Sequence, residues 1–169
     1  MLSPILKKSD CAACKFCCSF RRKSLWETPV FLKDDLEKIK ELFPLVKFRS
    51  VGNSSVTVEL SHLYKSDREE EEVACPFLNG EKGCLLPPEL KPFDCNIWPF
   101  RAVRIDNEKI AVALTPTCKV INQVSRGDIL ALLKSGLGEK IIDYAKKNPD
   151  IIKESSSFLS DILYPDSLM

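Results

Sequence analysis

Apolar residues recur at helical spacing in the first third of the chain. Leu32, Leu36, Ile39 and Phe43 are separated by four, three and four residues, which is typical of one face of a helix. Acidic residues crowd the first turns, where the helix dipole favours negative charge, and Pro44 follows the last apolar position. We therefore expect one amphipathic helix that ends before this proline.

Residues 125–169 show the same spacing over a longer stretch. The apolar positions that share one face are Ile129, Leu132, Leu133, Leu137, Ile141 and Ala145. Ser125 or Asp128 is the expected N-cap, and Gly136 and Gly138 are expected to divide the stretch into two helices. This part of the chain is therefore predicted to be helical.

A last amphipathic helix is predicted after Asn148 and Pro149, which resemble an N-cap followed by proline at the first helical position. Its inner face would comprise Ile151, Ser155, Phe158 and Ile162. It contains no cysteine, so we expect it to cover the core.

Two other stretches alternate between apolar and polar residues with the period of a strand. Val56, Val58 and Leu60 predict a half-buried strand that follows a turn at residues 52–55. Apolar positions also alternate over residues 103–105 and 110–114. These two runs predict a β-hairpin whose loop is formed by the four residues between them.

Composition narrows the classes of partner and compartment. Lys+Arg 25 against Asp+Glu 24 leaves a net charge of +1, so we expect no nucleic acid and no membrane surface as partners. No apolar run approaches the roughly 18 residues that span a bilayer. Residues 2–6 form too short an apolar run for the core of a signal peptide. We expect a cytoplasmic protein.

The chain has eight cysteines, which is far more than packing requires. They are Cys11, Cys14, Cys17, Cys18, Cys75, Cys84, Cys95 and Cys118. Cytosolic thiols stay reduced, so this pattern favours metal binding over a disulfide framework, which is the alternative. A free buried cysteine acting as a small apolar residue is a second alternative for one or two of the eight.

Turn residues predict that two of the remote cysteines meet. Asn79 and Gly80 form a strong turn signal between Cys75 and Cys84, and Gly83 offers a second flexible point. A tight loop or hairpin of this kind would bring the two thiols close together.

The spacing C-x2-C-x2-C is the one with which a short loop supplies three thiolates to a [4Fe–4S] cluster. Cys11 and Cys14 with two remote cysteines would equally complete an all-thiolate zinc site, and His62 is the only histidine. Neighbouring side chains on extended backbone point to opposite faces, so Cys17 and Cys18 would ligate different metals of one centre or serve two sites. All eight cysteines are therefore candidate ligands of one or two centres.

The cysteine pattern resembles the YkgJ-type cysteine-cluster family, described as a zinc- or iron-chelating domain. The motifs that carry the resemblance are C-x2-C-x2-C-C at Cys11, C-P-F-L at Cys75, Cys84, K-P-x-x-C-N-x-W-P at Lys91, and Cys118. The chain departs at Lys91 and Asn96, where the family has arginine, and at Trp98, where it has Phe or Tyr. The resemblance implies metal binding, most often as an iron–sulfur cluster. Flagellin lysine N-methylases carry a similar pattern within a larger chain.

Together these features predict a small single α+β domain over residues 1–169. A cysteine-cluster metal core would occupy residues 11–118, with short antiparallel strands and hairpins, and a helical extension would occupy residues 125–169. The first functional hypothesis is an iron–sulfur protein with a redox, sensing or modification-support role and a protein partner. The others are a zinc-stabilised adaptor and a component or relative of a protein lysine N-methylase. We do not expect an enzyme by itself, because no base, carboxylate pair or nucleotide loop accompanies the thiols.

Overall fold

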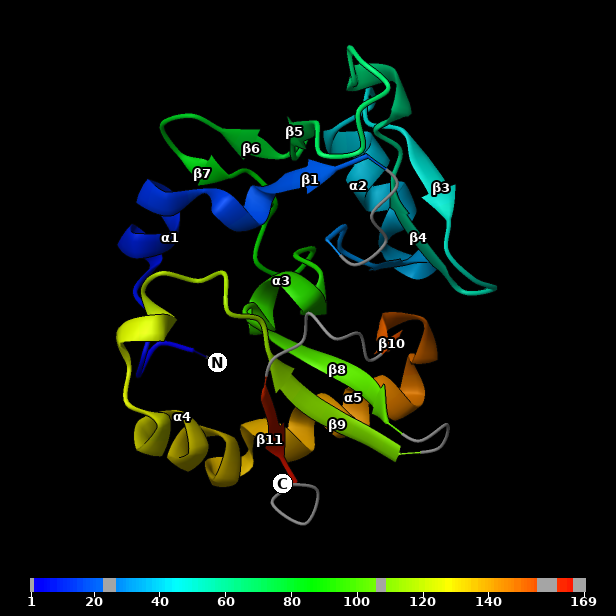
Figure 1. The fold of residues 1–169 in the computed structure, drawn as a ribbon. Coiled ribbons are helices and arrows are strands. Elements are labelled where there is room, and N and C mark those ends of the chain that lie inside the picture. The colour runs from blue at the N-terminus through cyan, green and yellow to red at the C-terminus, as the bar shows by residue number, and fades with distance from the viewer. Residues whose placement is uncertain (1, 23–26, 106–108, 155–160, 166–169) are drawn as a thin grey trace. The chain divides into compact units, whose positions relative to one another are not determined.

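A computed structural model describes residues 2–22, 27–105, 109–154 and 161–165 of the chain (Figure 1). The chain divides into two compact units. Cys11–Cys95 form one, here called the cysteine-rich unit, and Met1–Asp10 with Asn96–Met169 form the other, here called the helix–sheet unit. Both contain helices and antiparallel strand pairs, so the predicted α+β class is confirmed.

Short elements make up the cysteine-rich unit and its boundaries. The helical segments are α1 (Lys8–Cys14), η1 (Phe16–Cys18), η2 (Lys33–Asp35), α2 (Leu36–Leu42), η3 (Ser61–Leu63) and α3 (Phe93–Ile97). The strands are β1 (Ser19–Arg21), β2 (Phe31–Leu32), β3 (Phe48–Ser50), β4 (Ser55–Val58), β5 (Glu72–Ala74), β6 (Leu78–Asn79) and β7 (Gly83–Cys84). They pair as β1-β5, β2-β4-β3 and β6-β7, all antiparallel.

The predicted helix and strand of this unit are both present, with one difference in burial. The helix ends at Leu42, before Pro44, and its Ile39 is fully buried. β4 is buried at all four positions rather than half-buried, because it lies in the middle of its sheet. Its Thr57 satisfies its hydroxyl by donating a hydrogen bond to the Pro29 carbonyl at 2.7 Å.

The helix–sheet unit contains the longest strands of the described chain. Its strands are β8 (Phe100–Ile105), β9 (Lys109–Leu114), β10 (Lys153–Glu154) and β11 (Asp161–Tyr164), in the order β10-β8-β9-β11. Its helical segments are η4 (Ile121–Gln123), α4 (Arg126–Leu132), the π-helical η5 (Leu133–Leu137), α5 (Gly138–Lys147) and η6 (Pro149–Ile151). The predicted β8–β9 hairpin is present, and part of its loop lies outside the described residues.

The two predicted helices of this unit follow from local residue choices. The Ser125 hydroxyl caps α4 by accepting the Asp128 N–H at 3.1 Å. Gly136 has φ 111°, which interrupts the helix and separates α4 from α5. α5 buries Ile141 and Ala145 and lies against β8 and β9 (Figure 1). In the described part of the chain, no helix is long and apolar enough to cross a membrane.

The prediction of a last helix over residues 151–162 is wrong where the structure describes it. Only η6 is helical, and strands β10 and β11 follow it. β10 pairs in parallel with β8, and β11 pairs antiparallel with β9. Ile151 and Ile162 fit either element, and pairing with a distant strand decides between them. Ser155 and Phe158 lie outside the described residues.

Candidate metal centre

The ladder between β1 and β5 brings two cysteine-bearing segments together. Ser19 pairs with Ala74, and the ladder continues by one residue, since the Cys75 N–H donates to the Cys18 carbonyl at 2.7 Å. The antiparallel register therefore places the end of the N-terminal cysteine motif directly opposite Cys75. Residues far apart in the sequence thus become neighbours at one site.

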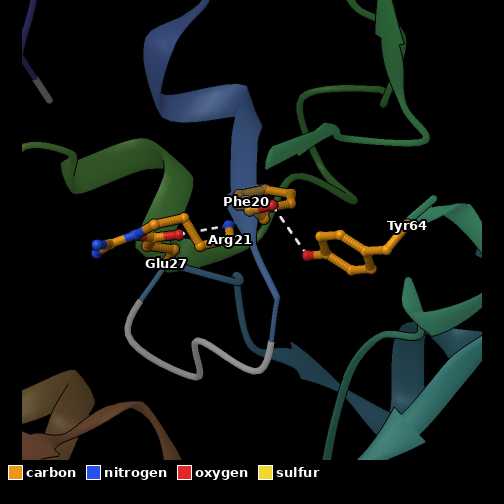
Figure 2. Close-up of polar contacts among 4 residues, drawn as sticks. All are labelled: Phe20, Arg21, Glu27 and Tyr64. Atoms are coloured by element: carbon orange, nitrogen blue, oxygen red, sulfur yellow. Dashed lines mark hydrogen bonds and ion pairs between the residues drawn. The ribbon is translucent and has the colours of Figure 1, made fainter. Parts of the chain in front are cut away.

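Side-chain contacts fix the backbone of β1 in addition to this ladder, as Figure 2 shows. The Tyr64 hydroxyl donates to the Phe20 carbonyl at 2.9 Å. The Glu27 carboxylate accepts the Arg21 backbone N–H at 2.6 Å and also the Nε–H of the same arginine. Burial, followed by the charge of Glu27, raises the pKa of Tyr64, so its hydroxyl remains a donor. The strand that follows Cys18 is therefore held at several backbone atoms.

The predicted hairpin after Cys75 is present. The Leu78 N–H donates to the Cys75 carbonyl at 2.9 Å, and Leu78 pairs with Cys84 across β6 and β7. The Asn79 side-chain oxygen closes the turn by accepting the N–H groups of the two residues after Gly80, both at 2.9 Å. The hairpin thus carries one thiol at its start and one at its end.

Phe77 anchors this hairpin in the core of the cysteine-rich unit. Its side chain is fully buried. Its ring lies 5.1 Å from the Phe43 ring in an edge contact and 5.7 Å from the Phe31 ring. The C-P-F-L motif therefore joins a cysteine to a core residue two positions later, which fixes where the Cys75 thiol can lie.

Cys17 and Cys18 form part of a 3-10 turn, so the extended backbone assumed for them is not observed. A hydrogen bond from the Cys17 thiol to the Cys18 sulfur, followed by burial, raises the pKa of Cys17 well above its usual range. The two adjacent thiols therefore interact with each other instead of pointing to opposite faces of the backbone.

The Cys75 thiol interacts with thiols from both segments. Burial raises the pKa of Cys75 to about 12, and the charges of Cys84 and Cys17 add to this effect. A hydrogen bond from the Phe77 backbone opposes the shift. Cys75 therefore interacts electrostatically with Cys17 and Cys84, and Cys17 in turn interacts with Cys18.

The other four candidate ligands lie in different settings. Cys11 and Cys14 are exposed and lie three residues apart on α1. Cys95 is partly buried in α3, where its N–H donates to the Pro92 carbonyl at 3.1 Å. Cys118 belongs to the helix–sheet unit, and its carbonyl accepts the N–H of a residue in η4.

The gathered thiols have the donor chemistry of a soft-metal site. Neighbouring thiols disfavour the ionisation of Cys17 and Cys75 by raising the pKa of each, and a bound cation would relieve that repulsion. Within residues 2–22, 27–105, 109–154 and 161–165, no three Cys, His, Asp or Glu side chains are disposed to hold one ion. The thiols are nevertheless donors that suit a soft metal ion in their chemistry.

Two lysines near the thiols were not singled out from the sequence as functional. The charge of Lys91 lowers the pKa of Cys17, against the larger effects that raise it. The Lys15 ammonium donates to the Gly80 carbonyl at the hairpin turn. The sequence indicates a role for them only through their positions: Lys15 lies inside the cysteine motif, and Lys91 lies four residues before Cys95.

Comparisons with protein-family models, with curated proteins and with solved structures found no match for this chain. The resemblance to the YkgJ-type family therefore stays a prediction that rests on the cysteine motifs.

Proposed function

We propose that the cysteine-rich unit binds a metal centre through cysteine thiolates, and that this centre is an iron–sulfur cluster of the [4Fe–4S] type. The protein would have a redox, sensing or modification-support role in the cytoplasm and would act with a protein partner. The observation that carries the proposal is the meeting of Cys18 and Cys75 across the β1–β5 ladder, with the Cys75 N–H donating to the Cys18 carbonyl.

The position of each cysteine suggests which centre it would ligate. Cys17, Cys18, Cys75 and Cys84 would supply the first donors, because the interactions of Cys17 with Cys18, and of Cys75 with Cys17 and Cys84, favour a shared site. Cys11 and Cys14 are exposed on the helix that precedes Cys17, and they would supply further ligands to the same site or to a second one. A bound iron–sulfur cluster would supply one-electron transfer at a potential that depends on the surrounding charge and exposure.

The direct test is anaerobic purification followed by iron, sulfide and zinc analysis and by visible absorption spectroscopy. We expect a brown protein with broad charge-transfer absorption and about four iron and four sulfide per centre. Cys75→Ser is expected to lose the colour and the iron. A colourless, iron-free protein that is fully folded would refute the iron–sulfur proposal.

A matched set of variants assigns the ligands. Cys17→Ser and Cys84→Ser should lose metal as Cys75→Ser does, because their thiols interact with Cys75. Cys118→Ser reports whether a cysteine of the helix–sheet unit takes part. Unchanged metal content in the first two variants would exclude the gathered thiols as the ligand set.

Zinc is the second candidate, and the shortness of the strands in the cysteine-rich unit favours it. Its longest strand, β4, has four residues, and β1 and β5 form a two-stranded pair. Pairs of this size are marginal without further support. Zinc bound by four thiolates would contribute folding free energy directly. Stoichiometric zinc in a colourless protein, with unfolding of the unit by a chelator, would support this candidate.

A further inference from the structure

Lys15 connects the two thiol-bearing segments of the cysteine-rich unit. It lies between Cys14 and Cys17 in the N-terminal motif. Its ammonium group donates a hydrogen bond to the carbonyl of Gly80, at the turn of the hairpin that joins Cys75 to Cys84. This contact adds a link on the far side of the hairpin from the β1–β5 ladder.

The backbone at Lys15 is unusual for a lysine. Its φ of 55° and ψ of 2° are left-handed, a conformation that favours glycine or asparagine. The Lys15 N–H donates to the Cys11 carbonyl at 3.0 Å, and its carbonyl accepts the Cys18 N–H at 3.0 Å. The residue thus ends α1, starts the turn that carries Cys17, and directs its side chain to the hairpin.

We infer that Lys15 is a positioning residue that holds the Cys75–Cys84 hairpin against the N-terminal cysteine motif. Glycine would suit the backbone better but could not reach the hairpin, so the side chain explains why a lysine stands at a left-handed position. That the gathered groups are metal ligands rests on the proposed function. The hairpin contact itself can be tested without metal.

The test measures the alkylation rate of each cysteine in metal-free, reduced protein by mass spectrometry. Lys15→Met keeps the length and the Cβ of the side chain and removes the donor. We expect the partly buried Cys17 and Cys75 to react about fivefold faster in this variant, because loss of one hydrogen bond changes a local opening equilibrium by about that factor. Lys15→Arg keeps a donor and should restore the slow rates.

Two further variants separate positioning from a general structural or charge effect. Lys82→Met removes a positive charge from the same turn and should leave both rates unchanged. Lys15→Gly relieves the backbone strain and removes the contact. It should therefore raise the melting temperature or leave it unchanged while the two cysteines still react faster. A purely structural role for Lys15 would make stability and alkylation change together.

Wild-type rates at every cysteine in Lys15→Met would overturn the inference, and so would an equal acceleration in Lys82→Met. If the wild-type protein binds metal, Lys15→Met should also lose it to a chelator about fivefold faster. If the wild-type protein binds none, the proposed function fails and the alkylation result still decides the role of Lys15.

Discussion

The two units of this chain are stabilised in different ways. The helix–sheet unit pairs two six-residue strands and buries one face of a ten-residue helix against them. The cysteine-rich unit has strands of two to four residues, joined by turns and long connections around a cluster of phenylalanines. The first unit therefore resembles an ordinary small core, and the second has much less regular backbone pairing.

The thiols are concentrated in the unit with the shorter elements. Seven cysteines lie within Cys11–Cys95, and only Cys118 lies in the helix–sheet unit. Short strand pairs have little stability of their own, and a metal that ties them together would contribute its binding free energy to folding. If the cysteine-rich unit binds metal as proposed, changes in this unit should affect metal binding, and equal changes in the helix–sheet unit should not.

The largest effect should come from a pair of buried phenylalanines, one in each unit. Phe77 and Phe100 are both fully buried. Each Phe→Ala change should lower the free energy of unfolding by about 3–5 kcal/mol, through lost transfer free energy and a cavity. Chemical denaturation measures this cost, and metal analysis separates the variants. Only Phe77→Ala should reduce metal content, because Phe77 anchors the loop that carries Cys75.

If the alanine variants do not fold, the milder Phe77→Leu and Phe100→Leu allow the same comparison of stability and metal content. Equal loss of metal in both members of a pair would show that the units do not differ in this respect.

A smaller effect is expected within the helix–sheet unit at Gly138. A Cβ at this position would lie 2.7 Å from two atoms of the Tyr164 ring. Alanine gains about 1 kcal/mol of helix propensity over glycine, but the clash should outweigh it and destabilise the unit by about 1–3 kcal/mol. Thermal unfolding measures the net change, and metal content should stay at the wild-type level.

Gly127→Ala is the matched control for this prediction. Its Cβ would meet only the Ser125 hydroxyl at 3.7 Å, which is ordinary contact, so we expect unchanged or higher stability. Equal melting temperatures for the two alanine variants would contradict the close packing of α5 on β11.

Elements fixed by local residue choices could be predicted from the sequence. The stop before Pro44, the cap at Ser125 and the break at Gly136 each rest on one residue with a strong backbone preference. The C-terminal strands could not be predicted in this way. These strands pair with β8 and β9, and the sequence pattern around Ile151 and Ile162 does not indicate that pairing.

In the candidate site, too, features set by local residues could be predicted and features set by distant pairing could not. The turn chemistry of Asn79 and Gly80 was enough to predict the hairpin from Cys75 to Cys84. The meeting of Cys18 with Cys75 depends on the register of two three-residue strands, which are too short to show a period. The hydrogen bond from Lys15 to Gly80 could not be predicted either, because it requires a left-handed backbone at Lys15, which lysine rarely adopts.

Removal of the α4 cap should have a modest effect confined to the helix–sheet unit. The Ser125 hydroxyl accepts the Asp128 N–H at 3.1 Å and donates to its carboxylate at 2.7 Å. Ser125→Ala should cost about 1 kcal/mol of stability, and Ser125→Asn should recover most of it. Hydrogen exchange of α4 amides measures the change. Faster exchange in the cysteine-rich unit as well would contradict the prediction that the effect is confined to the helix–sheet unit.

The smallest expected effect is a loss of stability at low pH, and it is confined to the cysteine-rich unit. The Glu71 carboxylate accepts the Ser66 hydroxyl at 2.5 Å and the N–H groups of Lys65 and Ser66 at 2.7 Å. The hydroxyl is the largest of the causes that lower the pKa of Glu71 from 4.5 to about 2. Because the folded pKa is depressed, the stabilisation is fully present above pH 4.5 and is lost as the pH falls toward about 2.

An NMR titration of the Glu71 carboxyl carbon tests this directly. We expect a midpoint near pH 2 in the wild-type protein and a higher midpoint in Ser66→Ala, because the strongest of the hydrogen bonds to the charged form is removed. Glu71→Gln should abolish the acid-induced change in amide exchange over residues 64–72 and leave α5 unaffected. A wild-type midpoint near 4.5 would show that the loop does not hold the carboxylate, and acid would then no longer distinguish the two units.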